Sequence, residues 1–181
     1  MSYQQLVTYA TELEDDYQDD EGAELWENSP FAWIRDNKSA TIGAIGRRLS
    51  RSIFQNAGVS AIPSNKRLRI GNAIVIVKFS LEWTGGGFVF EQFKNINFDY
   101  AFCLGLRPDN ALGWLIPSSE IIDDGVWQTR DGLRSQHTGA TGNETAWLSV
   151  NPDDIQDWLS PFGGSIQFVE QRIATMFGST A

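Results

Sequence analysis

The stretch RLRIGNAIVIVKFSLEW, residues 67–83, decides the fold. Its β-branched and aromatic residues predict a short strand over residues 68–70 and a long strand over 73–83, joined by a turn at Gly71-Asn72. Because successive side chains of a strand point to opposite faces, the long strand has two different faces. One face is apolar and consists of Val75, Val77, Phe79 and Leu81. The other face is mostly polar and consists of Ile76, Lys78, Ser80 and Glu82.

The segment before this stretch predicts a helix over residues 39–57. Ser39 is expected to cap its start and Gly58 to end it. Its apolar stripe is formed by Ile42, Ile45, Leu49 and Ile53. Further upstream, apolar residues at helical spacing predict an amphipathic helix over residues 3–17, and the acidic residues 18–30 are expected to form a linker or exposed loop.

The segment after the long strand predicts both strands and helices. They are a short helix over residues 90–96, apolar strands over 100–106 and 112–116, and a short helix over 151–159 that starts at Asn151-Pro152. Ser165 is expected to cap a last helix that ends at Gly178. The residues of this helix that face inward are Ile166, Val169, Ile173 and Phe177. This order of elements predicts an α/β fold with a mixed sheet.

The formal net charge of −9 hides regions of very different charge. Residues 1–27 contain nine Asp and Glu and no Lys or Arg, so the rest of the chain is neutral. Residues 35–78 contain nine Lys and Arg and a single acid, Asp36. A basic surface attracts nucleic acid, because phosphates that it neutralises release their counterions. The simpler alternative is that these cations are solvent-exposed residues of a helix face, with the acidic segment folded against them.

Length and composition indicate a folded protein with one domain. At 181 residues, 41% hydrophobic and 12% aromatic, the chain is long enough to bury a substantial core. No stretch approaches the roughly 18 apolar residues of a transmembrane helix, and no secretion signal is visible, so we expect a cytoplasmic protein without a membrane partner. The single cysteine, Cys103, excludes an internal disulfide and is expected in the core.

Several segments, in their order and spacing, resemble the PD-(D/E)xK restriction endonucleases. They are ENSPFAWIRDNKSATIGAIG (27–46), VKFSLEW (77–83), FEQFKNINFDYAFCLGL (90–106), WLIPS (114–118), QHTG (136–139), TAWLSVNP (145–152) and WLSPFGG (158–164). The resemblance implies a restriction-endonuclease-like mixed β-sheet flanked by helices. Together with the charge pattern, it divides the chain into an acidic N-terminal helical arm, residues 1–27, and a nuclease-like domain, residues 28–181. It also implies double-stranded DNA as a partner and a homodimer, or pairing with an active subunit.

Nucleases of this family need two carboxylates and a lysine around one or two Mg²⁺ ions. An acid and a lysine two positions apart on a strand share one of its faces. Lys78 matches the lysine of the motif, but Ile76 stands where the acid is expected. Lys66 is the best match to the preceding acid, and Arg47 replaces the helix glutamate. The resemblance therefore implies a DNA-binding protein that has lost its metal ligands and its cleavage activity, and no bound metal is expected.

Seven basic residues are the candidates for contacts with DNA phosphates. They are Arg47, Arg48, Arg51, Lys66, Arg67, Arg69 and Lys78. Such contacts position a protein on DNA, whereas the sequence is read by contacts with base edges. In the simpler alternative, Ile76 is ordinary strand core and the basic residues are ordinary surface, so the resemblance extends to the fold alone.

Two other functions remain open. An active Mg²⁺-dependent endonuclease would need a relocated carboxylate beside Lys78, and the candidates are Glu82 and Glu91. Glu82 shares the face of Lys78, but four residues at about 3.3 Å each place it roughly 13 Å away along the strand. Asp99 is expected to cap the start of a strand instead. The other function is a protein-interaction module whose acidic arm mimics DNA or covers the basic residues.

Two rarer residue types are weaker indicators. His137, the only histidine, is expected to make a loop hydrogen bond or a phosphate contact rather than to act as a catalytic base. The seven tryptophans are spread along the chain, so most are interpreted as core or subunit contacts, with base stacking as an alternative for one or two.

Overall fold

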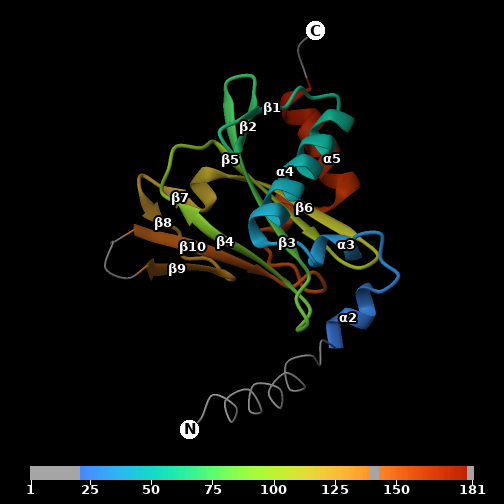
Figure 1. Cartoon of the computed structure of the whole chain (residues 1–181). Helices are drawn as coiled ribbons and strands as arrows, with labels where there is room; N and C mark the ends of the chain where they lie inside the picture. Colours follow the sequence, from blue (N-terminus) through green and yellow to red (C-terminus); the bar gives the residue numbers. More distant parts are fainter. Residues whose placement is uncertain (1–20, 139–142, 179–181) are drawn as a thin grey trace, which may run out of the picture.

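The computed structural model describes residues 21–138 and 143–178, and in this part of the chain β3 (Ala73–Leu81) runs through the middle of a six-stranded sheet (Figure 1). The order of this sheet is β1 (Ile62–Ser64), β2 (Arg67–Ile70), β3, β5 (Tyr100–Leu106), β6 (Ala111–Pro117) and β11 (Gly163–Ser165). β3 and β5 are parallel and the other neighbours are antiparallel. The prediction of an α/β fold with a mixed sheet is confirmed.

A second sheet covers one face of the first, and helices cover the other (Figure 1). The second sheet has the order β4 (Phe88–Lys94), β10 (Asn143–Val150) and β9 (Leu133–Thr138). The helices are α2 (Glu21–Trp26), α3 (Ala32–Arg35), α4 (Ser39–Asn56) and α5 (Ile166–Phe177). A small ribbon of β7 (Ile122–Asp123) and β8 (Val126–Trp127) and two short 3₁₀ turns, Ser118–Glu120 and Ser160–Phe162, complete the described elements.

The two faces of β3 contribute to two different cores, as the alternation of its side chains predicts. Val75 is fully buried among helical residues such as Phe54 of α4 and Ile173 of α5. Ile76 is 6% exposed and packs between the two sheets with residues such as Phe90 of β4. β3 is therefore covered on both faces, which anchors it as the central strand.

The two long helices have the predicted ends, with one difference. The chain leaves α4 through Gly58 at φ +76°, where the amides of Gly58 and Val59 donate to the carbonyls of Gln55 and Phe54. The Ser165 hydroxyl accepts a hydrogen bond from the Phe168 amide and caps α5 as predicted. The expected cap at Ser39 is wrong: α4 already begins at Ser39, and the preceding residue is a lysine whose side chain makes no capping bond.

The helix expected over residues 90–96 is wrong, because β4 occupies this segment. Phe90 and Phe93 are both fully buried at a separation of three residues, which imitates helical spacing. In a regular strand, residues three apart would point to opposite faces. A bulge lets both phenylalanines face the core: Gln92 has φ +56°, and the pairing of β4 with β10 shifts register there.

Two other expectations of local structure are also wrong. Residues 151–159 form turns rather than a helix, because the Asn151 side chain accepts a hydrogen bond from the Asp153 amide and so favours a turn. The expected loop over residues 18–30 contains α2, whose Trp26 is 3% exposed and packs in the helical core. The helix expected over residues 3–17 lies outside the described residues.

α4 approaches β3 most closely at Gly46, which lies in the buried stripe of α4 with Ser50 and Phe54. A Cβ atom on Gly46 would collide with the side chain of Phe79. Glycine at this position therefore lets the helix backbone rest directly on the strand.

Replacing Gly46 with alanine is expected to lower the free energy of unfolding by about 1–3 kcal/mol, because the added methyl group overpacks the contact with Phe79. The matched control is Gly43→Ala. The nearest neighbour that its Cβ would meet is Nη1 of the flexible Arg47 side chain, at 3.7 Å. Alanine favours a helix by up to about 1 kcal/mol over glycine, so this control should retain or gain stability. Urea unfolding of both variants measures the difference, and equal losses would contradict the close contact.

Candidate functional site

An open hollow of about 730 Å³ lies between the start of α4, the second half of β3 and β4. Four of the residues predicted to be functional line it: Arg47, Lys78, Glu82 and Glu91. Arg35, at the end of α3, lines it as well. β3, which carries the motif lysine Lys78, therefore forms one wall of a concave surface. Ligands commonly bind at such surfaces.

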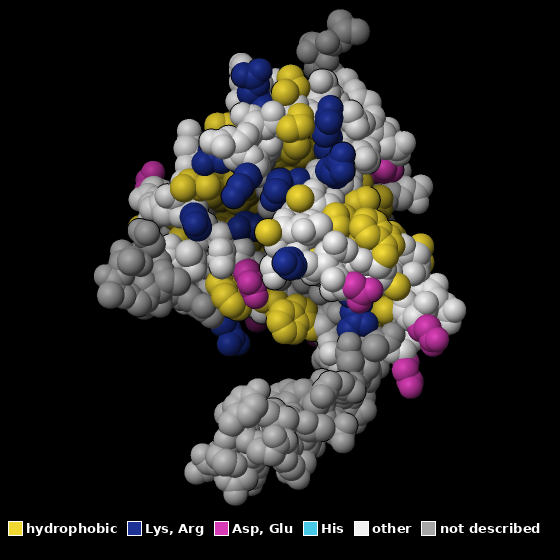
Figure 2. Space-filling view, viewed as in Figure 1, with side chains coloured by type: hydrophobic (Ala, Val, Ile, Leu, Met, Phe, Trp, Pro, Cys, Tyr) yellow, Lys and Arg dark blue, Asp and Glu magenta, His cyan; other side chains and the backbone are white. Residues whose placement is uncertain are grey.

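The surface around this hollow is basic. Figure 2 shows many Lys and Arg side chains and few acidic ones on the face that α4 and the β1–β2 hairpin present. The exposed cations of these elements are Arg48, Arg51, Lys66 and Arg69. Lys66 lies in the turn of the hairpin with φ +67°. The charge imbalance of residues 35–78 in the sequence thus becomes a basic face in the folded chain.

The predicted cations do not all have the same freedom to bind a ligand. Arg47 lines the hollow, and the next residue, Arg48, is exposed on the surface. The Nε of Arg51 donates to the Ala61 carbonyl at 3.1 Å, and Nη1 of Arg67 donates to the Asn97 carbonyl at 3.0 Å. These two arginines therefore also hold the loops that flank the sheet.

Lys78 has a structural role that the sequence did not reveal. Its Nζ donates to the carbonyls of Glu91 and Gln92, at 2.8 and 2.6 Å, and lies 5.0 Å from the centre of the Phe93 ring. These partners belong to the bulge of β4, so the ammonium group binds carbonyl oxygens at the point where the strand is irregular. Lys78 thereby ties β3 to the second sheet.

The pKa of Lys78 is lowered from 10.5 to about 8, mainly by burial and in smaller part by the positive charge of Lys94. The opposing influence of the Glu91 carboxylate is smaller than that of burial. Lys78 is therefore mostly protonated at pH 7 but loses its proton more readily than an exposed lysine.

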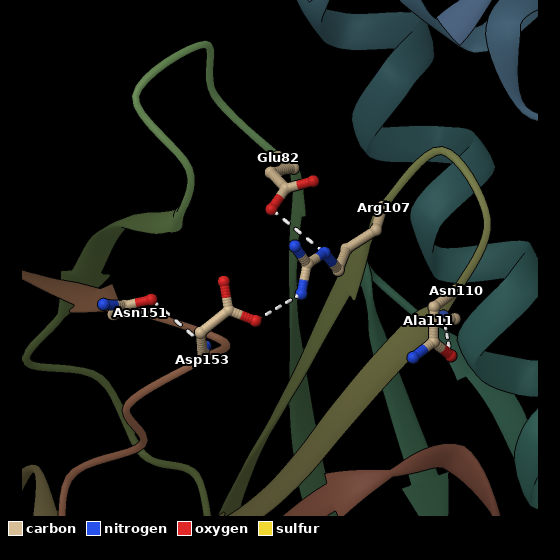
Figure 3. A network of polar contacts seen from close by, with 6 residues as sticks. All are labelled: Glu82, Arg107, Asn110, Ala111, Asn151 and Asp153. Carbon is tan, nitrogen blue, oxygen red and sulfur yellow. Dashed lines mark hydrogen bonds and ion pairs between the residues drawn. The ribbon is translucent and has the colours of Figure 1, made fainter. Parts of the chain in front are cut away.

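Glu82 is held away from a metal-binding role by an ion pair (Figure 3). Its Oε1 lies 3.0 Å from Nε of Arg107, and Nη1 of Arg107 lies 2.8 Å from Oδ1 of Asp153. The hydrogen bond with Asp153 raises the pKa of Arg107 above its ordinary value, so this cation stays charged between the two acids. The network joins the ends of β3 and β5 to the loop that follows β10.

The other carboxylates of interest are spread over the structure. Glu91 is exposed on β4, where the sequence analysis expected a helix. The carboxylate of Asp99 accepts a hydrogen bond from the Ile74 amide at 2.7 Å, beside the start of β5. This contact confirms the prediction that Asp99 caps the start of a strand.

The hollow does not fit a Mg²⁺ ion. Ile76, at the acid position of the motif, is buried between the sheets, and Glu82 is bound to Arg107. Divalent cations of this kind need several oxygen ligands around one point. In the described part of the chain, no three His, Cys, Asp or Glu side chains come together in a way that could hold a metal ion.

Three other residue types were singled out by the sequence: the cysteine, the histidine and the tryptophans. Cys103 is fully buried in the core between the sheets, as expected, and this burial raises the pKa of its thiol. His137 lies on β9, but its side chain is outside the described part of the structure. Of the tryptophans, Trp114 is fully buried, whereas Trp83 is 60% exposed and lines the hollow.

Arg35 and Trp83 are the residues of the hollow that the sequence analysis did not select. Arg35 belongs to the basic segment 35–78, so the charge pattern contained a signal for it. Trp83 is the last residue of VKFSLEW, but no pattern in the sequence distinguishes it from the other tryptophans.

Comparison with known proteins provides no assignment for this site. No family model matches the chain, and no curated protein or solved structure matches it either. Among the described helices, none is long and apolar enough to cross a membrane.

The lowered pKa of Lys78 predicts a specific pH dependence of stability. Between pH 8 and 10.5 the unfolded chain binds more protons at this residue than the folded chain, so stability rises with pH. Relative to the Lys78→Met variant, the free energy of unfolding of the unmodified protein should rise by about 1 kcal/mol from pH 7 to pH 9. Urea unfolding at both pH values measures this. A constant difference between the two proteins would mean that Lys78 titrates like an exposed lysine.

Proposed function

We propose that this chain is a restriction-endonuclease-like protein that binds double-stranded DNA and does not cleave it. The observation that carries this proposal is the lining of the hollow. Arg35, Arg47 and Lys78 line the region where a nuclease of this type would hold its metal ions, and Ile76 replaces the acid of the motif. Of these cations, Arg47 stands where the resemblance implies an acid, whereas Lys78 is the lysine of the motif itself, and Lys66, the other cation in place of an acid, does not line the hollow. A cation in place of an acid repels Mg²⁺ and attracts the phosphate that the metal would otherwise bind.

The fold supports the proposal in its general form. A helix, α4, precedes the β2–β3 hairpin, and β3 pairs in parallel with β5 in a mixed sheet. The motif lysine lies in the middle of β3, and the hollow opens beside it. The resemblance to PD-(D/E)xK endonucleases implies a mixed sheet flanked by helices; the mixed sheet is present, with helices on one face and the second sheet on the other.

The charge distribution supports DNA over a basic or neutral ligand. Of the two carboxylates that line the hollow, Glu82 is paired with Arg107, and the cations that line it are Arg35, Arg47 and Lys78. A concave surface of one charge sign concentrates oppositely charged ligands. The exposed cations on α4 and the β1–β2 hairpin extend this attraction beyond the hollow. A homodimer would place two such faces on the two strands of a duplex.

One observation favours a second candidate, an active endonuclease. Glu82 and Glu91 line the same hollow as Lys78, although they come from different elements. Release of Glu82 from Arg107 would be needed before both carboxylates could face a common ion.

Salt dependence tests the role of the hollow in DNA binding. Arg47→Gln is expected to weaken binding to a labelled duplex and to reduce the slope of log K against log salt by about 1, because one phosphate contact is lost. Arg48→Gln should behave similarly. Arg134→Gln, on β9 of the second sheet, removes the same charge and serves as the control. Fluorescence anisotropy over a range of salt concentrations provides the slopes. If Arg47→Gln leaves the slope unchanged, DNA phosphates do not contact Arg47 and the proposed binding face is wrong.

Cleavage assays separate the two candidate functions. Supercoiled plasmid incubated with the protein and Mg²⁺ or Mn²⁺ is expected to remain intact, since no three potential metal ligands come together among the described residues. Agarose gel electrophoresis measures nicking and linearisation. Cleavage that both Lys78→Ala and Glu91→Gln abolish would establish the active endonuclease instead.

A further inference from the structure

Trp83 lies at the border of two adjoining hollows. It lines the large hollow together with Arg35 and Arg47, and it also lines a smaller one of about 190 Å³. Arg35, Glu82 and Thr84 line both as well. With 60% of its surface exposed, the indole is a large aromatic group at the edge of a cation-lined depression.

The loop that follows Trp83 holds this residue in a defined position. The Trp83 amide donates to the Gly87 carbonyl at 2.9 Å, and the Gly86 amide donates to the Trp83 carbonyl at 2.8 Å. Glu82, the preceding residue, is anchored by Arg107 and by a backbone hydrogen bond to Leu106. The backbone on both sides of Trp83 is therefore tied to the fold, although its side chain is exposed.

The glycines of this loop leave the approach to Trp83 open. Gly86 has φ +72°, a conformation that favours glycine. Gly85 has no such requirement, and a Cβ atom there would meet no other atom within 4 Å. Neither backbone conformation nor packing explains glycine at this position. Glycine is also used where another molecule must approach the backbone closely, and that explanation fits Gly85.

We propose that Trp83 stacks on an unpaired nucleobase of a nucleic acid whose phosphates lie along Arg35 and Arg47. This inference rests on the proposed function and adds to it the class of preferred ligand, DNA with a single-stranded or locally opened segment. Base–aromatic stacking next to a positively charged groove is the general way in which proteins bind single strands. In a closed duplex the faces of internal bases are already stacked, so Trp83 contributes only where a base is free.

The smaller hollow has the composition that suits the edge of such a base. Leu25 and Trp26 provide apolar walls, while the Glu82–Arg107 pair provides hydrogen-bonding groups. The exposed apolar side chains of this site are Trp83 and Leu25, and they lie beside the cations Arg35 and Arg47, whereas a protein partner would need a broader apolar surface. The chemistry next to Trp83 therefore favours a nucleic acid.

The test uses the full chain and three labelled DNA ligands of the same sequence: a closed duplex, a duplex with a central unpaired bubble, and the single strand. Fluorescence anisotropy is expected to show tighter binding of the bubble and the single strand than of the duplex. Trp83→Ala should weaken binding of these two ligands by about 5- to 150-fold, the range typical of losing one base–aromatic stack, and change duplex binding less than about twofold. Trp83→Phe should retain most of the affinity.

Trp33→Ala is the matched control, because Trp33 is similarly exposed at 57% but does not line either hollow. Thermal unfolding of each variant verifies that the fold is intact. Equal affinity of Trp83→Ala and the unmodified protein for the bubble would overturn the inference, as would an equal loss for all three ligands. Loss of self-association without a change in DNA affinity would assign Trp83 to a subunit contact and also overturn it. If the unmodified protein binds no DNA at all, the proposed function fails first, whereas duplex binding without preference for the bubble refutes only the role of Trp83.

Discussion

β3 has both of its faces covered, so its large apolar side chains divide between two cores. Val75 packs under the helices and Ile76 packs between the sheets. The direct contact of α4 with Phe79, which Gly46 permits, sets the position of the helix on this strand. The hollow lies along the second half of β3, where Val77, Lys78, Phe79 and Leu81 are only partly buried. The position of the candidate site therefore follows from how β3 is packed.

Lys78 connects this packing to the chemistry of the site. An apolar side chain at its position would leave the Glu91 and Gln92 carbonyls without the donor that they now have. The ammonium group is bound at the cost of partial burial, which lowers its pKa to about 8. A lysine at this position is therefore useful to the fold even without a metal ion. This structural role is consistent with a nuclease-like protein that has Lys78 but lacks the acid at Ile76.

The acidic residues near the hollow are also used by the fold. Glu82 and Asp153 share Arg107, and the Asp99 carboxylate binds the Ile74 amide. Freeing Glu82 would be costly, because this carboxylate would lose its partner while its side chain is only 11% exposed. The cations behave differently, since Arg48, Lys66 and Arg69 are exposed on one face. The local balance of charge on this face is therefore positive although the chain as a whole is acidic.

The sequence alone determined the elements whose signals are local. The alternation in residues 73–81, the apolar runs of β5 and β6, and the ends of α4 and α5 at Gly58 and Ser165 need no distant partner to be recognised. Only the tertiary structure decided that β4 is a strand and that it forms a second sheet with β10 and β9. Its bulge lets both Phe90 and Phe93 face the core, although their spacing in the sequence is helical. It also decided that Glu82 meets Arg107 and that Trp83 adjoins Arg35. These contacts join residues far apart in the chain, and no local pattern of side chains encodes which of the many charged or aromatic residues will meet.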